Sequence, residues 1–159
     1  MITLQFVSSS GWSSKLIGWA GAGHLSHVDA VCPDGGLLGA RSDKMGAAAP
    51  GVQVRPQGYY RFSRRVLMQI PATQEQESRF WIFLNHQLAK PYDRMAILAF
   101  VFNRDWRETD SWICSELQAA ALEAAGIVPR LYLDANKISP VALALAVSAI
   151  PGTTWTEKK

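Results

Sequence analysis

The stretch Asp110-Ser-Trp-Ile-Cys-Ser-Glu-Leu117 decides both the fold and the chemistry expected of this chain. Asp110 or Ser111 can cap a helix running from Trp112 to Ala125, because short polar side chains accept hydrogen bonds from the first N–H groups of a helix. Gly126 follows, where a left-handed residue commonly closes a helix. Cys114 therefore falls in the first turn of this predicted helix.

The position of Cys114 is compatible with two roles. Backbone N–H groups and the positive end of the helix dipole stabilise a thiolate in a first helical turn. A thiolate is a nucleophile, and the same N–H groups can hold an oxyanion. Free cysteine is also often a small buried hydrophobic residue. Position alone favours this second role for Cys114.

A nucleophilic cysteine needs a base, and the chain has three histidines, His24, His27 and His86. His24 lies in a glycine-rich loop, and His86 lies on a predicted helix, where it decorates the surface or edge. His27 opens a predicted strand, which fixes a side chain better than a loop does. We therefore expect His27 to be the base if Cys114 is the nucleophile, with a strand-edge histidine of no catalytic role as the alternative.

A third polar group normally orients the imidazole, and two candidates are open. A hairpin closed by residues 33–36 would put Cys32 opposite Leu37 and therefore Ser42 opposite His27. Asp29 lies two residues beyond His27 and so on the same face of the same strand. Both are also ordinary strand residues. Cys32, at the end of this strand, is expected to pack in the core.

The remaining segments predict an α+β fold, in which strands and a small helix precede further helices. Met95–Phe102 is apolar and fits either a buried helix or a buried strand. The whole chain, residues 1–159, is expected to form one domain with a C-terminal tail from about residue 151. The strands are expected at Ile2–Val7, His27–Cys32, Leu37–Arg41, Val52–Arg55 and Arg65–Ile70, and the helices around Leu16–Trp19, at Thr73–Ala89 with a capping box, at Trp112–Ala125 and from Ser139-Pro140.

Composition and spacing disfavour several classes of function. The formal charge of +3 is small and the basic residues are scattered, so nucleic-acid binding is weakly supported. No Cys-x-x-Cys or His-x-x-x-His pair suggests a metal site, and no glycine-rich phosphate loop suggests a cofactor. Two cysteines in 159 residues do not resemble a disulfide scaffold. We therefore expect neither a metal nor a cofactor.

The N-terminus lacks the basic start and apolar run of a signal peptide. The most apolar stretches, Met95–Phe102 and Val141–Ile150, are shorter than the roughly 20 residues that span a bilayer. We expect a chain made in the cytoplasm without a transmembrane segment. A protein carried in a virion or released on lysis is the other possibility.

Four segments together resemble the circularly permuted papain-like cysteine hydrolases. They are Ser26-His-Val-Asp-Ala-Val31, Gly51-Val-Gln-Val-Arg-Pro56, Tyr92-Asp93 and Trp112-Ile-Cys-Ser-Glu-Leu117. The family includes the YiiX-like proteins, the NlpC-type peptidases and the lecithin retinol acyltransferase relatives. The resemblance extends to about Ile150 and implies a small antiparallel sheet or partial barrel packed on helices. It also implies that Cys114 is the nucleophile and His27 the base.

The family usually carries its third polar residue on the return strand, near Gly39 here, and Gly39-Ala-Arg41 offers no carboxylate or amide. The third residue therefore stays open between Ser42 and Asp29. Glu116 matches the family and is interpreted as structural. The implied substrate is an amide bond, first in a peptidoglycan-type peptide. The alternatives are a lipid-acting acyltransferase or thioesterase and a non-catalytic module of a larger assembly such as a phage particle. Oligomeric state is not indicated.

Overall fold

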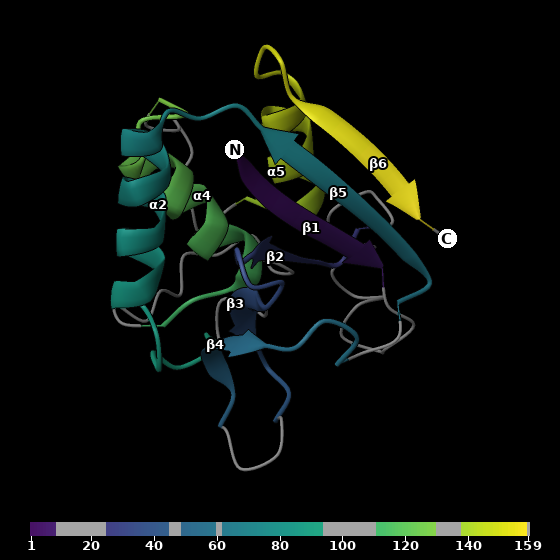
Figure 1. Cartoon of the computed structure of the whole chain (residues 1–159). Helices are drawn as coiled ribbons and strands as arrows, with labels where there is room; N and C mark the ends of the chain where they lie inside the picture. Colours follow the sequence, from purple (N-terminus) through teal and green to yellow (C-terminus); the bar gives the residue numbers. More distant parts are fainter. Residues whose placement is uncertain (9–24, 45–48, 60–61, 94–110, 130–137, 159) are drawn as a thin grey trace.

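The structure is a computed structural model that describes residues 1–8, 25–44, 49–59, 62–93, 111–129 and 138–158 (Figure 1). Four parts of the sequence prediction lie outside these ranges: the short helix around Leu16–Trp19, His24, the Met95–Phe102 segment and Asp110.

Six antiparallel strands form one sheet in the order β4-β3-β2-β1-β5-β6 (Figure 1). Three helices complete the described fold, so the predicted α+β class is confirmed. The strands are β1 (Ile2–Ser8), β2 (His27–Val31), β3 (Leu37–Arg41), β4 (Gly51–Arg55), β5 (Arg64–Ile70) and β6 (Thr154–Lys158), and the helices are α2 (Gln74–His86), α4 (Cys114–Ala124) and α5 (Pro140–Ser148).

One face of the sheet builds the hydrophobic core, because alternate residues of a strand point to the same side. Each fully buried Leu, Ile or Phe contributes about 1.5–3 kcal/mol relative to an exposed one. The core joins Leu4, Phe6, Val28, Ala30, Leu38, Ala40, Val52 and Met68 of the sheet to Phe80 and Leu84 of α2, Leu117, Ala121 and Leu122 of α4, and Leu143 and Val147 of α5.

The opposite face of β1 to β4 is polar and yet largely buried. Gln5 pairs with Asp29 across β1 and β2, and Gly39 pairs with Gln53 across β3 and β4. Gln5, Asp29 and Arg55 are each no more than 1% exposed. A buried charged group needs hydrogen-bond or ion-pair partners, so the polar side chains of this face are expected to contact one another.

The predicted helix ends are largely confirmed. The Thr73 N–H donates to Gln76 Oε1 at 2.9 Å and the Gln76 N–H donates to Thr73 Oγ1 at 3.2 Å, which is a complete capping box. Ser139 caps α5, and Gly126 follows α4 with a φ of +67°. Within the described residues, no helix is both long enough and apolar enough to cross a membrane.

The predicted helix to Ala89 was too long, because α2 ends at His86 and Ala89 itself has a φ of +66°. The predicted tail after residue 150 is also wrong, because residues 154–158 form β6 against β5. A turn precedes this strand, in which the Thr153 N–H donates to the Ile150 carbonyl at 3.1 Å and Gly152 has a φ of +83°. The turn sends the chain back along the sheet after α5.

The hairpin between β2 and β3 differs from the prediction by one residue. Val31, not Cys32, pairs with Leu37. The Cys32 N–H donates to the Gly36 carbonyl at 2.8 Å, so the turn has three residues and Gly35 takes a φ of +87°. A shift of one residue changes which residues face one another across the hairpin. Continuing the pairing places Arg41, not Ser42, opposite His27.

Candidate active site

Backbone pairing fixes the point at which α4 begins. The Trp112 N–H donates to the Pro91 carbonyl and the Asp93 N–H donates to the Trp112 carbonyl, both at 3.1 Å. These bonds keep residues 111–113 extended, and Ile113 has φ −97° and ψ 161°. Ile113 is therefore the cap of α4 in place of the predicted Asp110 or Ser111, and Cys114 is the first helical residue.

The start of α4 offers a cysteine with helix N–H groups around it. The first intrahelical bond runs from the Leu117 N–H to the Ile113 carbonyl at 3.1 Å. The N–H groups of the three preceding residues therefore have no carbonyl partner within the helix, and the positive end of its dipole lies at Cys114. Glu116 accepts a hydrogen bond from the Ile113 N–H at 3.4 Å, which supports its interpretation as a structural residue.

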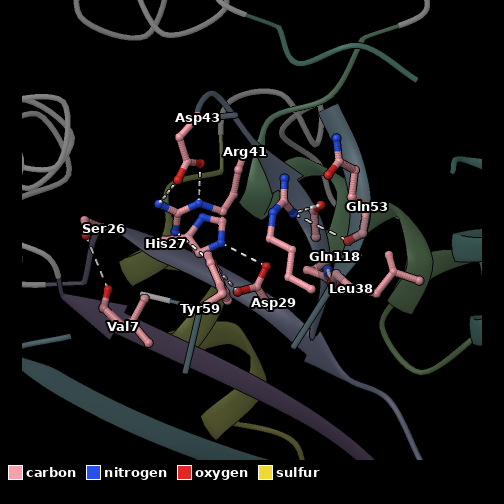
Figure 2. Close-up of polar contacts among 12 residues, drawn as sticks. Val7, Ser26, His27, Asp29, Leu38, Arg41, Asp43, Gln53, Tyr59 and Gln118 are labelled. Carbon is pink, nitrogen blue, oxygen red and sulfur yellow. Dashed lines mark hydrogen bonds and ion pairs between the residues drawn. The ribbon is translucent and has the colours of Figure 1, made fainter. Parts of the chain in front are cut away.

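Two buried side chains of α4 hold the helix in place beside the sheet. Gln118 Nε2 donates to the Leu38 carbonyl of β3 at 3.0 Å (Figure 2). Ser115 Oγ donates to the Ile138 carbonyl at 2.6 Å. Gln118 thus anchors α4 to the sheet at β3, and Ser115 anchors it to the segment that leads into α5.

Cys114 and His27 are brought together, and both are buried, at 4% and 8% exposure. Burial alone would lower the pKa of His27, but the charges of Asp29 and Cys114 and hydrogen bonds to both raise it to about 9. Burial alone would raise the pKa of Cys114, but the charge and the hydrogen bond of His27 lower it. The two shifts favour a thiolate–imidazolium pair.

Asp29, one of the two candidate third residues, contacts the imidazole directly. Asp29 Oδ1 lies 2.9 Å from His27 Nε2, and the carboxylate is fully buried (Figure 2). Ser42 lies beyond the last residue of β3, and the observed register does not bring it opposite His27. The geometry therefore joins Cys114, His27 and Asp29 and leaves Ser42 outside this set.

The absence of a side chain at Gly39 makes room for the Asp29 carboxylate. A Cβ atom built on Gly39 would lie 2.0 Å from Asp29 Oδ1, far inside van der Waals contact. This is the same oxygen that faces His27. Gly39 lies at the return-strand position where a third polar residue was sought. The Asp29 carboxylate of the neighbouring strand packs against this position.

Sequence reasoning missed a cluster of polar side chains around Asp29. The Tyr59 hydroxyl lies 3.5 Å from Asp29 Oδ2 and accepts from Arg41 Nη1 at 2.9 Å (Figure 2). Arg41 Nε and Nη2 donate to the two carboxylate oxygens of Asp43 at 2.6 and 3.1 Å. Arg55 donates to the carbonyls of Gly39 and Gly51. The correct hairpin register would have pointed to Arg41, whereas no pattern in the sequence points to Tyr59.

Two aromatic residues flank the cysteine in sequence or in space. Burial raises the pKa of Tyr92, and the charge of Cys114 raises it further, as expected for a phenol near the thiolate. The Trp112 indole N–H donates to Gln87 Oε1 at 3.1 Å. The Trp112 ring packs edge-on against the Phe83 ring, with 6.0 Å between the ring centroids. The Trp112 ring is therefore directed towards α2.

The other histidine and cysteine of the described chain lie apart from this set. His86 is exposed at the end of α2, and Cys32 is half-buried in the turn after β2. Among the described residues, no group of three or more His, Cys, Asp or Glu side chains is arranged to hold a metal ion.

Comparison with known proteins gives a likeness of fold. No protein-family model matches the sequence, and no curated protein matches it. The structure is similar to the crystal structure of the metalloprotein YiiX from Escherichia coli O157:H7, with a TM-score of 0.61 and 19% sequence identity. The match covers 99% of this chain and 96% of YiiX, so the two share their fold over nearly their whole length.

Proposed function

We propose that this protein is a thiol hydrolase that cleaves an amide bond through Cys114 and His27. One observation supports this proposal above the others: a continuous series of contacts runs from the Cys114 thiol through His27 to Asp29. Asp29 engages Nε2 of the imidazole, which leaves Nδ1 as the nitrogen for the thiol. A nucleophile, a base and a group that orients the base are the components of a catalytic triad.

In the proposed reaction the Cys114 thiolate attacks the carbonyl carbon of the amide. N–H groups at the start of α4 stabilise the oxyanion that forms. The His27 imidazolium donates its proton to the nitrogen of the leaving amine, the C–N bond breaks and an acyl-thioester remains on Cys114. A water molecule then attacks the thioester while neutral His27 takes up its proton, and the C–S bond breaks, which releases the acid and restores the thiolate–imidazolium pair.

A peptidoglycan-type peptide is the first candidate substrate, because the sequence resembles NlpC-type peptidases. Lysis or a virus particle would then carry the protein to its substrate. Lipid esters and amides are the second candidate. The missing carboxylate at Gly39 was the main argument for a non-catalytic module, and Asp29 supplies a carboxylate at the same place. This geometry favours the enzyme over the module.

The first experiment measures alkylation of each cysteine by iodoacetamide between pH 5 and 10, with peptide mass spectrometry to separate the two. Rates are normalised to the highest pH, so that access of the reagent cancels. We expect Cys114 to react well below the ordinary thiol pKa of about 8.5, and Cys32 to react only above it. A Cys114 profile with an ordinary midpoint would refute an activated thiolate.

Two histidine variants give the matched comparison. His27→Ala should remove the low-pH reactivity of Cys114, because the imidazolium that lowers its pKa is gone. His86→Ala changes the same residue type at an exposed position and should leave the profile unchanged.

A second experiment identifies the bond that is cleaved. The purified protein is incubated with peptidoglycan fragments, and separately with short acyl esters, and products are followed by mass spectrometry. Loss of turnover in Cys114→Ala and persistence in EDTA assign the activity to the thiol. Turnover that survives in Cys114→Ala would contradict the proposal, and turnover that EDTA abolishes would favour metal chemistry instead.

A further inference from the structure

The two carboxylate oxygens of Asp29 have different surroundings. Oδ1 faces His27 Nε2 at 2.9 Å, and Oδ2 faces the Tyr59 hydroxyl at 3.5 Å. The carboxylate is fully buried, so water does not fix its orientation. Its rotation about the bond to Cβ decides whether Oδ1 stays on the imidazole. A group bound to Oδ2 would therefore control that rotation.

The hydrogen bonding of Tyr59 determines which way its single proton points. A guanidinium only donates, so the Tyr59 oxygen must accept the bond from Arg41 Nη1 at 2.9 Å. The hydroxyl proton is then available to another acceptor, and Asp29 Oδ2 is the carboxylate oxygen beside it. The distance of 3.5 Å makes this a weak bond, so its expected effect is moderate.

The Tyr59 ring is itself held by two guanidinium groups. Arg41 Cζ lies 5.1 Å and Arg55 Cζ lies 5.8 Å from the ring centroid, both within the range of cation–π attraction. Asp43 fixes Arg41 through two hydrogen bonds, and the carbonyls of Gly39 and Gly51 fix Arg55. The position of the Tyr59 hydroxyl is thus determined by Arg41 of β3, the strand beside β2, and by Arg55 of β4, the strand after it in the sheet (Figure 2).

We propose that Tyr59 is a positioning residue for the Cys114–His27 pair and acts through Asp29, with Arg41 directing its hydroxyl. The inference rests on the proposed function, because it assigns Tyr59 a part in the same site. Tyr59 does not touch the thiol or the base. Its hydroxyl keeps Asp29 Oδ1 directed at His27, and the oriented carboxylate then favours the charged imidazolium and the thiolate.

The test compares Tyr59→Phe with the unaltered protein. This change removes the hydroxyl and keeps the ring between the arginines. We expect alkylation of Cys114 at pH 6 to fall about three- to tenfold, which corresponds to half a unit to one unit in the apparent pKa of the pair. The thermal unfolding temperature should stay nearly constant. An unchanged alkylation profile in Tyr59→Phe would overturn the inference.

A double-mutant cycle shows whether the effect passes through Asp29. In the Asp29→Asn background, Tyr59→Phe should produce no further loss of Cys114 reactivity, because the oriented carboxylate is already absent. An equal loss in both backgrounds would mean that Tyr59 acts by another route. If alkylation proved uninformative, titration of the His27 imidazole by NMR in the Cys114→Ala protein would measure the same coupling directly.

Arg41→Lys tests the other half of the proposal. Lysine keeps the charge but lacks the planar group that binds Asp43 and Tyr59 together, so we expect a loss similar to that of Tyr59→Phe. Arg64→Lys is the matched control, because Arg64 of β5 makes an equivalent two-bond pair with Glu157 of β6, and both side chains are exposed. An equal effect of both substitutions would overturn the role of Arg41. If unaltered Cys114 has an ordinary pKa, the proposed function itself fails; if only the variants are silent, the positioning role fails alone.

Discussion

The two cysteines lie near opposite ends of β2, and their surroundings shift the pKa values of the two thiols in opposite directions. At the start of the strand, His27 outweighs burial and lowers the pKa of Cys114. Just past its end, burial raises the pKa of Cys32, and the charge of Asp34 raises it further. The more deeply buried thiol is thus the more acidic one. Burial alone would predict the reverse, so the charge of the neighbouring group decides which cysteine can be a nucleophile.

The largest expected effect separates the two cysteines by substitution. Cys114→Ala should reduce amide hydrolysis by about 10³-fold or more, because the covalent route is lost. Cys32→Ala, the matched change at the other end of β2, should leave the rate within about twofold. Steady-state kinetics on the peptide substrate measure both. Comparable losses in the two variants would contradict the assignment of the nucleophile.

Asp29→Asn should reduce the activity of the Cys114–His27 pair without abolishing it. The charge of Asp29 is the largest contribution that raises the pKa of His27, so its loss lets burial lower that pKa from about 9. The imidazolium then loses its proton at a lower pH, so the falling limb of the pH profile of kcat/KM shifts to lower pH. We expect a loss of about 10- to 100-fold at pH 8. A limb that remained near pH 9 would show that Asp29 does not tune His27.

Gly39→Ala tests the close contact that admits the Asp29 carboxylate. The new Cβ atom would overlap Oδ1, which should cost about 1–3 kcal/mol of unfolding free energy and reduce Cys114 alkylation at pH 6 by about tenfold. Denaturant unfolding and alkylation rates measure these effects. In an Asp29→Gly background the alanine should cost little further stability. The same stability cost in both backgrounds would refute the proposed clash.

The smallest effect is expected at the other end of β2. Asp34→Asn removes the negative charge that helps raise the pKa of Cys32, and the amide oxygen can still accept the hydrogen bond from the Gly36 N–H. Alkylation of Cys32 at pH 8 should rise by less than about threefold, since the turn is partly open to water and salt screens it. Cys114 provides the internal control, and a change in its rate would contradict a local effect.

Local hydrogen-bond patterns made much of the fold predictable. The capping box at Thr73, the Ser139-Pro140 helix start and the Gly126 helix end depend on residues within a few positions of one another. The sequence also predicted that His27 and Cys114 lie together, but that expectation came from the resemblance to a family. Spacing alone does not bring the start of β2 to the start of α4.

The errors arose where distant parts of the chain decide the structure. The cap of α4 moved to Ile113 because Trp112 pairs with residues 91–93, which are far away in sequence. Residues 154–158 form a strand because they pair with β5, which is about 90 residues earlier in the sequence. The β2–β3 turn has three residues and not the predicted four, which shifts the pairing by one residue. Arg41 therefore takes the position opposite His27 that was predicted for Ser42. The choice between Asp29 and Ser42 therefore needed the structure.

The contact between Asp29 and Gly39 also restricts the order in which substitutions can accumulate. A side chain at position 39 displaces the carboxylate at position 29 from its place beside His27 unless that carboxylate has already been lost. A carboxylate added at position 39 would compete with the Asp29 carboxylate for the same space and repel it, so the two acids are not expected to occupy this place together. The two positions should therefore vary together in related sequences, with an acid at one accompanied by glycine or another small residue at the other.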